Sequence, residues 1–332
     1  MVQLAETRSN HEVNGMRKRT AVVAIGGNAL IKDPQHLSVE DQEQSLRDIC
    51  PFLADMVVDG WNIAIGHGNG PQVGFILRRS EIAHSVEGMH EVPLDVCTAD
   101  TQGAIGYELQ QALQNELFHR GIRKDVATVV TQVLVNADDP AFHNPTKPIG
   151  GFLEAGEALR RRDELGWNVA EDSGRGFRRL VASPEPIEIV ELETVRSLLD
   201  SGVIVIAAGG GGVPVIDTGD GEYRGVAAVI DKDLASSLLA TQIGADLLVI
   251  ATSVDYVSLD YGTAAETAIT RASLAELRVY AAEERHFGKG SMAPKIESVI
   301  RFLERGGKKA LITSPLTIND ALNGKAGSWF YA

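Results

Sequence analysis

The chain has 332 residues, of which 44% are hydrophobic and 23% charged, and its formal net charge is −14 at pH 7. This composition is ordinary for a globular protein with one large α/β domain or two lobes, and the acidic balance argues against a surface for nucleic acid or anionic membranes. The two cysteines, Cys50 and Cys97, lack metal-ligand spacing, so a reducing cytoplasm fits best and neither a disulfide scaffold nor a zinc site is indicated. No apolar run approaches the roughly 18 residues that a membrane-spanning helix needs.

The N-terminal segment predicts an arm followed by the first strand of a sheet. Residues 1–19 are polar and lack the apolar core of a signal sequence, so we expect a flexible arm there and a single domain over 20–332. The apolar run 21–25 predicts a buried strand that ends at Gly26, Gly27 and Asn28. A strand that ends in paired glycines is a candidate phosphate turn. Apolar residues at helical spacing then predict an amphipathic helix over 42–59.

A second strand, over 62–65, runs into a glycine-rich segment at 66–74 before another helix begins. The segment lacks the third glycine of the dinucleotide fingerprint and the glycine-lysine-hydroxyl ending of a Walker loop. Within it, His67 is either a turn residue bonded to backbone or a catalytic base, and the first interpretation is favoured. Gly68, Asn69 and Gly70 form the second candidate phosphate turn.

After a helix around 105–117 and a strand at 126–131, turn-forming residues begin at 136. We expect residues 136–183 to leave the main sheet as a small lid. Its positive charge is concentrated in arginines, and those at 160–162 are explained most simply by a solvated helix surface. Lys147 differs, because Pro145 and Pro148 stiffen the chain on either side of it, which suits a positioned side chain.

The stretch from 203 to 239 is the centre of the chain. A buried strand at 203–208 is followed by four glycines, 209–212, and then by Asp231, Lys232 and Asp233 at a helix start, with Asp233 expected as the N-cap. A tight turn with an ion pair would explain a single glycine pair. Because each glycine costs backbone entropy, four in a row favour a phosphate site, with the positive end of the helix pointing toward it.

Beyond a strand at 246–251, the loop at 252–257 carries Asp255 and Tyr256; this aromatic ring would either flank a nucleobase or pack at the rim. Pro294 opens a further helix, so Lys295 lies in its first turn. A cation there opposes the helix dipole unless an anion binds nearby, which favours a functional lysine. A last strand is expected at 309–313.

Strands and helices alternate along the chain, so we expect an α/β fold: a three-layer αβα sandwich with a mainly parallel central sheet and a small protruding lid subdomain. Ligands of such sheets bind at the carboxyl ends of the strands, where the three glycine turns and two of the lysines fall. Glycine turns in both halves of the chain suggest two anionic groups that meet end to end. That arrangement is typical of phosphoryl transfer.

The motifs resemble those of the carbamate kinases, which have the amino acid kinase fold, and they occur in fixed order between about residues 20 and 313. The matching segments lie at 26–28, 67–74, 101–103, 144–150, 209–215, 229–233 and 290–295. The resemblance implies reversible phosphoryl transfer between carbamoyl phosphate and ADP, giving ATP and carbamate, in a cytoplasmic homodimer of arginine metabolism. It also implies that residues 20–200, with the lid, hold carbamoyl phosphate and that residues 201–332 hold the nucleotide.

Carried onto this chain, the resemblance assigns the site residues in three groups. The catalytic group is Lys147, Lys232, Asp233 and Lys295, with Asp233 orienting the lysines. The carbamoyl phosphate group is Gly26, Gly27, Asn28, Gly68, Asn69 and Gly70. The nucleotide group is Gly209, Gly210, Gly211, Asp231, Lys232, Asp255, Tyr256, Ser291, Met292 and Lys295. Mg²⁺ is expected to be held mainly by the nucleotide phosphates, without a dedicated set of protein ligands.

One departure from the wider fold is informative. Many proteins of this fold carry a lysine just before the first glycine pair, where this chain has Ala24 and Ile25. The resemblance implies that the lid residue Lys147 replaces that charge, which argues against acetylglutamate kinase and similar proteins. Two alternatives remain: a kinase of the same fold for another small carboxylate or phosphonate, and a non-catalytic nucleotide-binding protein. The joint presence of Lys147, Lys232, Asp233 and Lys295 disfavours the second alternative.

Overall fold

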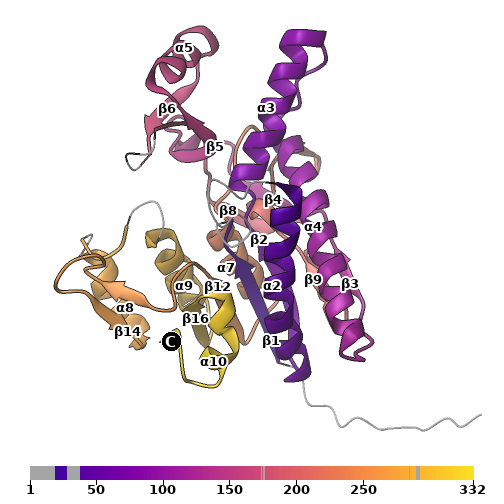
Figure 1. The fold of residues 1–332 in the computed structure, drawn as a ribbon, viewed down its shortest axis with the longest axis vertical. Helices are drawn as coiled ribbons and strands as arrows, with labels where there is room; N and C mark the ends of the chain where they lie inside the picture. Colours follow the sequence, from indigo (N-terminus) through magenta and orange to yellow (C-terminus); the bar gives the residue numbers. More distant parts are fainter. Residues whose placement is uncertain (1–18, 28–37, 173, 175, 284, 289–291) are drawn as a thin grey trace, which may run out of the picture.

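The computed structural model describes residues 19–27, 38–172, 174, 176–283, 285–288 and 292–332 (Figure 1). An eight-stranded sheet forms its centre, and every pair of neighbouring strands is parallel except β16 and β17. In order across the sheet, the strands are β15 (Arg271–Ser273), β17 (Ser328–Tyr331), β16 (Lys309–Thr313), β12 (Leu247–Ala251), β1 (Thr20–Ile25), β2 (Asn62–His67), β9 (Ile204–Ile206) and β3 (Val126–Thr128). The predicted mainly parallel sheet is confirmed.

Helices cover both faces of this sheet, as the side chains of β1 show. Val22 and Ala24 join an apolar cluster with helices on one face, whereas Ala21, Val23 and Ile25 join a second cluster on the other. The first cluster includes side chains of α6 (Leu192–Asp200), α7 (Lys232–Gln242), α8 (Leu274–Ala282) and α9 (Ala293–Glu304). The second includes side chains of α2 (Val39–Val58), α4 (Leu94–His119) and α10 (Ile318–Leu322). The αβα sandwich is therefore present, and strands buried on both faces explain the continuous apolar runs of the sequence.

The lid is a separate three-stranded antiparallel sheet with one helix, and it protrudes from the main body at the upper left of Figure 1. It consists of β5 (Lys147–Leu153), α5 (Ala155–Leu165), β6 (Asn168–Glu171) and β7 (Phe177–Val181), with β7 in the centre. The interpretation of residues 160–162 as a solvated surface is wrong for Arg161, which is only 3% exposed.

Smaller elements complete the chain. A second sheet has the order β11 (Tyr223–Gly225), β10 (Val213–Asp217), β4 (Gln132–Val135) and β8 (Pro186–Ile189), and a hairpin is formed by β13 (Val257–Leu259) and β14 (Thr267–Ile269). Helix α3 (Gly70–Glu87) and the short turns η1 (Pro140–Phe142), η2 (Gly209–Gly211) and η3 (Pro315–Thr317) lie in the connections. Within the described ranges, no helix is long and apolar enough to cross a membrane. The predicted arm lies outside the described residues except for Arg19.

The packing of α4 against the sheet gives a test of the fold. Leu113 is fully buried in the cluster that α4 shares with α2, so Leu113→Ala should leave a cavity and lower the free energy of unfolding by about 2–5 kcal/mol. The same substitution at Leu316, which is 63% exposed, should change it by no more than about 0.5 kcal/mol. Urea denaturation followed by circular dichroism measures both, and equal effects would contradict the assigned core.

Candidate active site

Three glycine turns meet at the carboxyl ends of the neighbouring strands β1, β2 and β9. The Gly68 amide donates to the Ile25 carbonyl at 2.9 Å, and a Cβ atom at Gly68 would lie 2.6 Å from the backbone nitrogen of Gly27. A Cβ atom at Gly210 would in turn lie 2.1 Å from the side-chain amide nitrogen of Asn69. Since the turns touch, only residues without a side chain allow this approach.

Three of the four consecutive glycines have a second reason in backbone geometry. The chain turns from β9 into η2 through positive φ angles at Ala208, Gly210, Gly211 and Gly212. Only glycine adopts this left-handed region without steric cost. The turn also packs closely, since a Cβ atom at Gly211 would lie 2.4 Å from the Ile230 carbonyl oxygen. The strand therefore ends against the segment that leads into α7.

Two carboxylates hold three lysines beside these turns. Lys147 Nζ lies 2.5 Å from Asp231 Oδ2. Asp233 accepts from two ammonium groups, with Lys232 on Oδ1 and Lys295 on Oδ2, the latter at 3.2 Å. The lysines come from β5 of the lid, from the first residue of α7 and from the first turn of α9. The structure thus brings together all four side chains expected to be catalytic, and their catalytic role remains a prediction.

Asp231, rather than Asp233, is the N-cap of α7, so the expected capping residue is wrong. Asp231 Oδ1 accepts from the backbone amide of Asp233 at 2.9 Å and from that of Leu234 at 3.4 Å, while its other oxygen holds Lys147. Asp233 therefore lies inside the first turn of the helix, where its carboxylate is free to face the lysines. The sequence alone does not show which of the two carboxylates is the N-cap, because aspartate is a favourable N-cap at either position.

Burial and neighbouring charges have opposing effects on the pKa values of Asp231 and Lys232. Burial raises the pKa of Asp231, but the ammonium of Lys147 and then that of Lys232 lower it, and the net shift is downward. Burial lowers the pKa of Lys232. The Asp233 carboxylate raises this pKa and the Lys295 ammonium lowers it, and the net shift is downward. Three ammonium groups thus face two carboxylates. An additional anion at this place would stabilise the charged lysines.

Side chains of helix α4 hold the glycine turns through hydrogen bonds. The sequence pattern did not predict these contacts. The side-chain amide of Gln102 donates to the carbonyls of Gly209, at 2.9 Å, and Thr131, at 3.1 Å, and accepts from the Thr131 amide at 2.7 Å. Its neighbour Thr101 accepts from the Asn69 side chain at 2.7 Å. The available signal was a pair of polar residues on the buried face of an apolar helix, because such residues need internal partners.

The expected nucleotide residues are placed unequally. Met292 is the N-cap residue of α9, three positions before Lys295. Tyr256 donates to the Lys325 carbonyl at 3.4 Å, and the exposed Asp255 follows β12 in the same loop. No contact links Tyr256 to the lysine cluster within the described residues, so its role beside a nucleobase stays a prediction. Asn28 and Ser291 lie outside the described residues.

His67 is a buried residue of the site floor. It is the last residue of β2, 1% exposed, and its Nδ1 contacts the Gly68 carbonyl at 3.2 Å. Burial lowers the pKa of His67 from 6.5 to about 4, although the Gly68 carbonyl opposes the shift. A Cβ atom at Gly209 would lie 2.3 Å from its Nε2. The imidazole is thus neutral at pH 7 and packs beneath the glycines, in agreement with the favoured interpretation of a backbone-bonded residue.

Known proteins resemble this chain over nearly its whole length. The model of the amino acid kinase family matches residues 19–314. The chain is 48% identical over 316 residues to the carbamate kinase-like protein YahI of Escherichia coli, covering 94% of this chain and 98% of that protein. It is also 48% identical over 307 residues to the carbamate kinase of Pyrococcus horikoshii, with coverages of 92% and 97%. The solved structure of carbamate kinase from Giardia lamblia bound to AMP-PNP has a TM-score of 0.86 and 38% identity, covering 95% and 98% of the two chains.

The buried imidazole predicts a dependence of stability on pH. The folded pKa of His67 is about 4 and the ordinary value is 6.5, so the unfolded chain binds a proton first as the pH falls. The free energy of unfolding should therefore decrease between about pH 6.5 and pH 4, by on the order of 3 kcal/mol from this group. Urea denaturation of His67→Gln should show a shallower slope over this range. His90→Gln, at an exposed position, is the control, and equal slopes in both variants would refute the assignment.

Proposed function

The chain belongs to the amino acid kinase family, and we propose that it is a carbamate kinase that transfers a phosphoryl group reversibly between carbamoyl phosphate and ADP, giving carbamate and ATP. The observation that carries the proposal is the meeting of Lys147, Lys232 and Lys295 at the glycine turns. Identity of 46–48% to several carbamate kinases over more than nine-tenths of the chain supports it.

The two substrates would approach from opposite halves of the chain. The turns after β1 and β2, with Gly27 and Gly68 in contact, would hold carbamoyl phosphate, and the turn after β9 together with α7 and α9 would hold the nucleotide. Backbone amides and helix N-termini bind phosphate oxygens well. The transferred group would then lie between the halves, in line between its donor and acceptor oxygens, and no covalent intermediate with the protein is needed.

The lysines would neutralise the phosphoryl oxygens, and the carboxylates would keep the lysines in place. Lys147 is paired with Asp231, and Lys232 and Lys295 share Asp233. Phosphoryl transfer depends mainly on positioning and charge neutralisation, which ammonium groups fixed in this way provide. A carbamate oxygen is already anionic near neutral pH, so attack needs no general base. Asp233 therefore acts as an organiser of Lys232 and Lys295, and Asp231 as an organiser of Lys147.

Mg²⁺ fits this arrangement as a companion of the nucleotide. The described side chains at the glycine turns offer mainly ammonium and N–H groups, and both carboxylates are occupied by lysines. These groups bind phosphate oxygens, whereas Mg²⁺ prefers oxygen ligands and keeps several waters. We propose that the ion is held through nucleotide phosphates, where it would neutralise further charge.

Identity alone does not choose the acceptor, because relatives named carbamate kinase-like proteins match as well as those named carbamate kinases. The decisive test is ATP formation by purified protein with ADP, Mg²⁺ and carbamoyl phosphate, with acetyl phosphate as control donor. We expect turnover with carbamoyl phosphate and little with acetyl phosphate. Faster turnover with acetyl phosphate would favour a kinase for another carboxylate, and ADP binding without turnover would favour a non-catalytic protein.

The same assay tests the lysine cluster. Lys295→Ala removes one of the two ammonium groups on Asp233 and should lower kcat by about 100-fold or more, as loss of a preorganised charge-stabilising group does. Lys309→Ala, an exposed lysine at the start of β16, should leave kcat within about twofold, as expected for a surface position. Full turnover by the Lys295 variant would remove the argument for its catalytic role.

We also propose a homodimer that works in the cytoplasm, in arginine metabolism. Helices α3 and α4 expose several large apolar side chains, which is typical of a surface that a second copy covers. These are Ile82, Val86, Val96, Tyr107 and Phe118. Sedimentation equilibrium should give twice the chain mass of 35.6 kDa, and Val86→Asp should shift the equilibrium toward monomer. A monomer at all concentrations would contradict this part of the proposal.

A further inference from the structure

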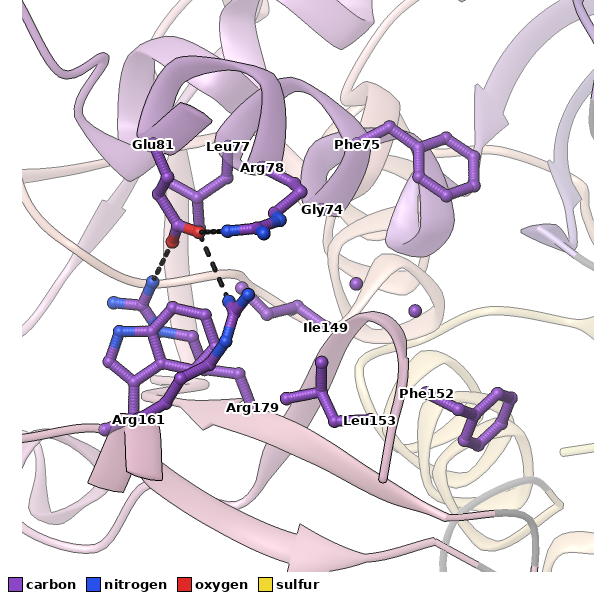
Figure 2. A pocket seen from close by; sticks show the side chains of 13 residues that line it. Gly74, Phe75, Leu77, Arg78, Glu81, Ile149, Phe152, Leu153, Arg161 and Arg179 are labelled. Atoms are coloured by element: carbon purple, nitrogen blue, oxygen red, sulfur yellow. Dashed lines mark hydrogen bonds and ion pairs between the residues drawn. The ribbon is translucent and has the colours of Figure 1, made fainter. Parts of the chain in front are cut away.

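A pocket of about 290 Å³ lies between the lid and helix α3 (Figure 2). Its walls come from α3 on one side and from β5, α5 and β7 on the other. One carboxylate, that of Glu81 on α3, faces the guanidinium groups of Arg161 and Arg179 of the lid (Figure 2). The pocket is therefore one of the places where the lid is attached to the body by charge, besides the pair of Lys147 with Asp231.

Glu81 is shared among three arginines. Its Oε2 lies 3.3 Å from Arg161 Nη1 and 3.3 Å from Arg78 Nη1, and its Oε1 lies 3.6 Å from Arg179 Nη1. Its side chain is 16% exposed and that of Arg161 only 4%, so solvent screens this pair weakly. Arg161 has a second carboxylate in Glu157, at 2.6 Å. Glu81 is thus the charge that connects two lid elements, α5 and β7, to the body.

An aromatic ring keeps both lid arginines in place. The guanidinium carbons of Arg161 and Arg179 lie 4.6 Å and 4.4 Å from the centre of the Trp167 ring, in cation–π contact. Two positive groups on one ring repel each other, and Glu81 offsets that repulsion. Removal of its charge would leave this repulsion without its offset, since arginine stays protonated at any pH a protein tolerates.

The strand pairing of the lid connects this attachment to the active site. In the antiparallel pair of β5 and β7, Ile149 lies opposite Arg179, and Lys147 lies opposite Val181. Arg179 is therefore held two residues along the ladder from the partner of Lys147. Next to Ile149 in β5, Gly150 touches the backbone of α3. Gly150 has φ +73°, and a Cβ atom at Gly74 would lie 2.0 Å from the Gly150 Cα.

We infer that Glu81 is a positioning residue for Lys147: its ion pairs with Arg161 and Arg179 fix the lid strands, so that the Lys147 ammonium lies over the glycine turns. The inference deepens the proposed phosphoryl transfer and rests on it. Helix α3 is suited to this role, since it begins at Gly70 in the second glycine turn and carries Glu81 three turns later. The same rigid element thus sets both the glycine turn and the lid.

The first experiment compares Glu81→Gln with Glu87→Gln, an exposed position of the same helix. Glu81→Gln keeps the size of the side chain and removes its charge. It should lower kcat about tenfold, since a shift of a catalytic group by about 1 Å has an effect of this order or larger. The KM for ADP should stay within twofold, because the lid belongs to the other half of the site. Arg179→Gln should act in the same direction if Glu81→Gln fails to fold.

A double-mutant cycle separates positioning from general stabilisation. If Glu81 acts through Lys147, Glu81→Gln should lower the residual turnover of a Lys147→Ala variant less than twofold. The effects of two mutations do not add when one residue acts through the other. The same tenfold loss in both backgrounds would overturn the inference. Unchanged kcat in Glu81→Gln and Arg179→Gln would overturn it as well.

A readout independent of activity distinguishes this inference from the function it rests on. Acrylamide quenching of Trp167, obtained by difference from Trp167→Phe, should increase in Glu81→Gln and not in Glu87→Gln, because loss of the ion pairs uncovers the ring. Wild-type protein that makes no ATP would refute the proposed function, while quenching would still decide whether Glu81 holds the lid. Equal quenching in all variants overturns the inference whatever their activities.

Discussion

The sharing of two carboxylates among three ammonium groups is the interaction on which the site depends. Asp231 and Asp233 lie at the start of α7, and through them Lys147, Lys232 and Lys295 remain close together although they repel. Burial makes each charge costly, and pairing offsets that cost only if the geometry is fixed. The fold fixes it by placing the start of α7 directly against the turn after β9. A strongly acidic chain thus contains a local positive site for anionic substrates.

The glycine turns and the lysines are two parts of one constraint. Neighbouring strands of a parallel sheet end at the same edge, so the turns after β1, β2 and β9 must share a small space. Gly68 and Gly210 allow that contact, because a Cβ atom at Gly68 would lie 2.6 Å from the backbone nitrogen of Gly27 and one at Gly210 would lie 2.1 Å from the side-chain nitrogen of Asn69. The lysines then approach from outside this edge, where α7, α9 and the lid surround it.

Much of the fold could be predicted from the sequence, because local patterns determine it. Apolar runs that end in glycine predicted the strands β1, β2 and β9 and the edge of the sheet at which they end. Pro294 predicted the start of α9. The pairing of Lys147 with Asp231 could not be predicted, since 84 residues separate them and the resemblance to a family assigned the orienting role to Asp233. Arg161 was misjudged because its partner Glu81 lies 80 residues away in the sequence, on helix α3.

The first strand explains why the position of the lid matters so much. Ala24 and Ile25 are fully buried on opposite faces of β1, so the end of this strand contributes packing and no charge. In the proposed function the positive charge comes from Lys147, which is carried by a subdomain with its own sheet. A charge on a rigid central strand needs no further support, whereas a charge on a protruding subdomain is only as well placed as the contacts that hold that subdomain. The ion pairs at Glu81 and the backbone contact of Gly74 with Gly150 are the described contacts that serve this purpose from α3.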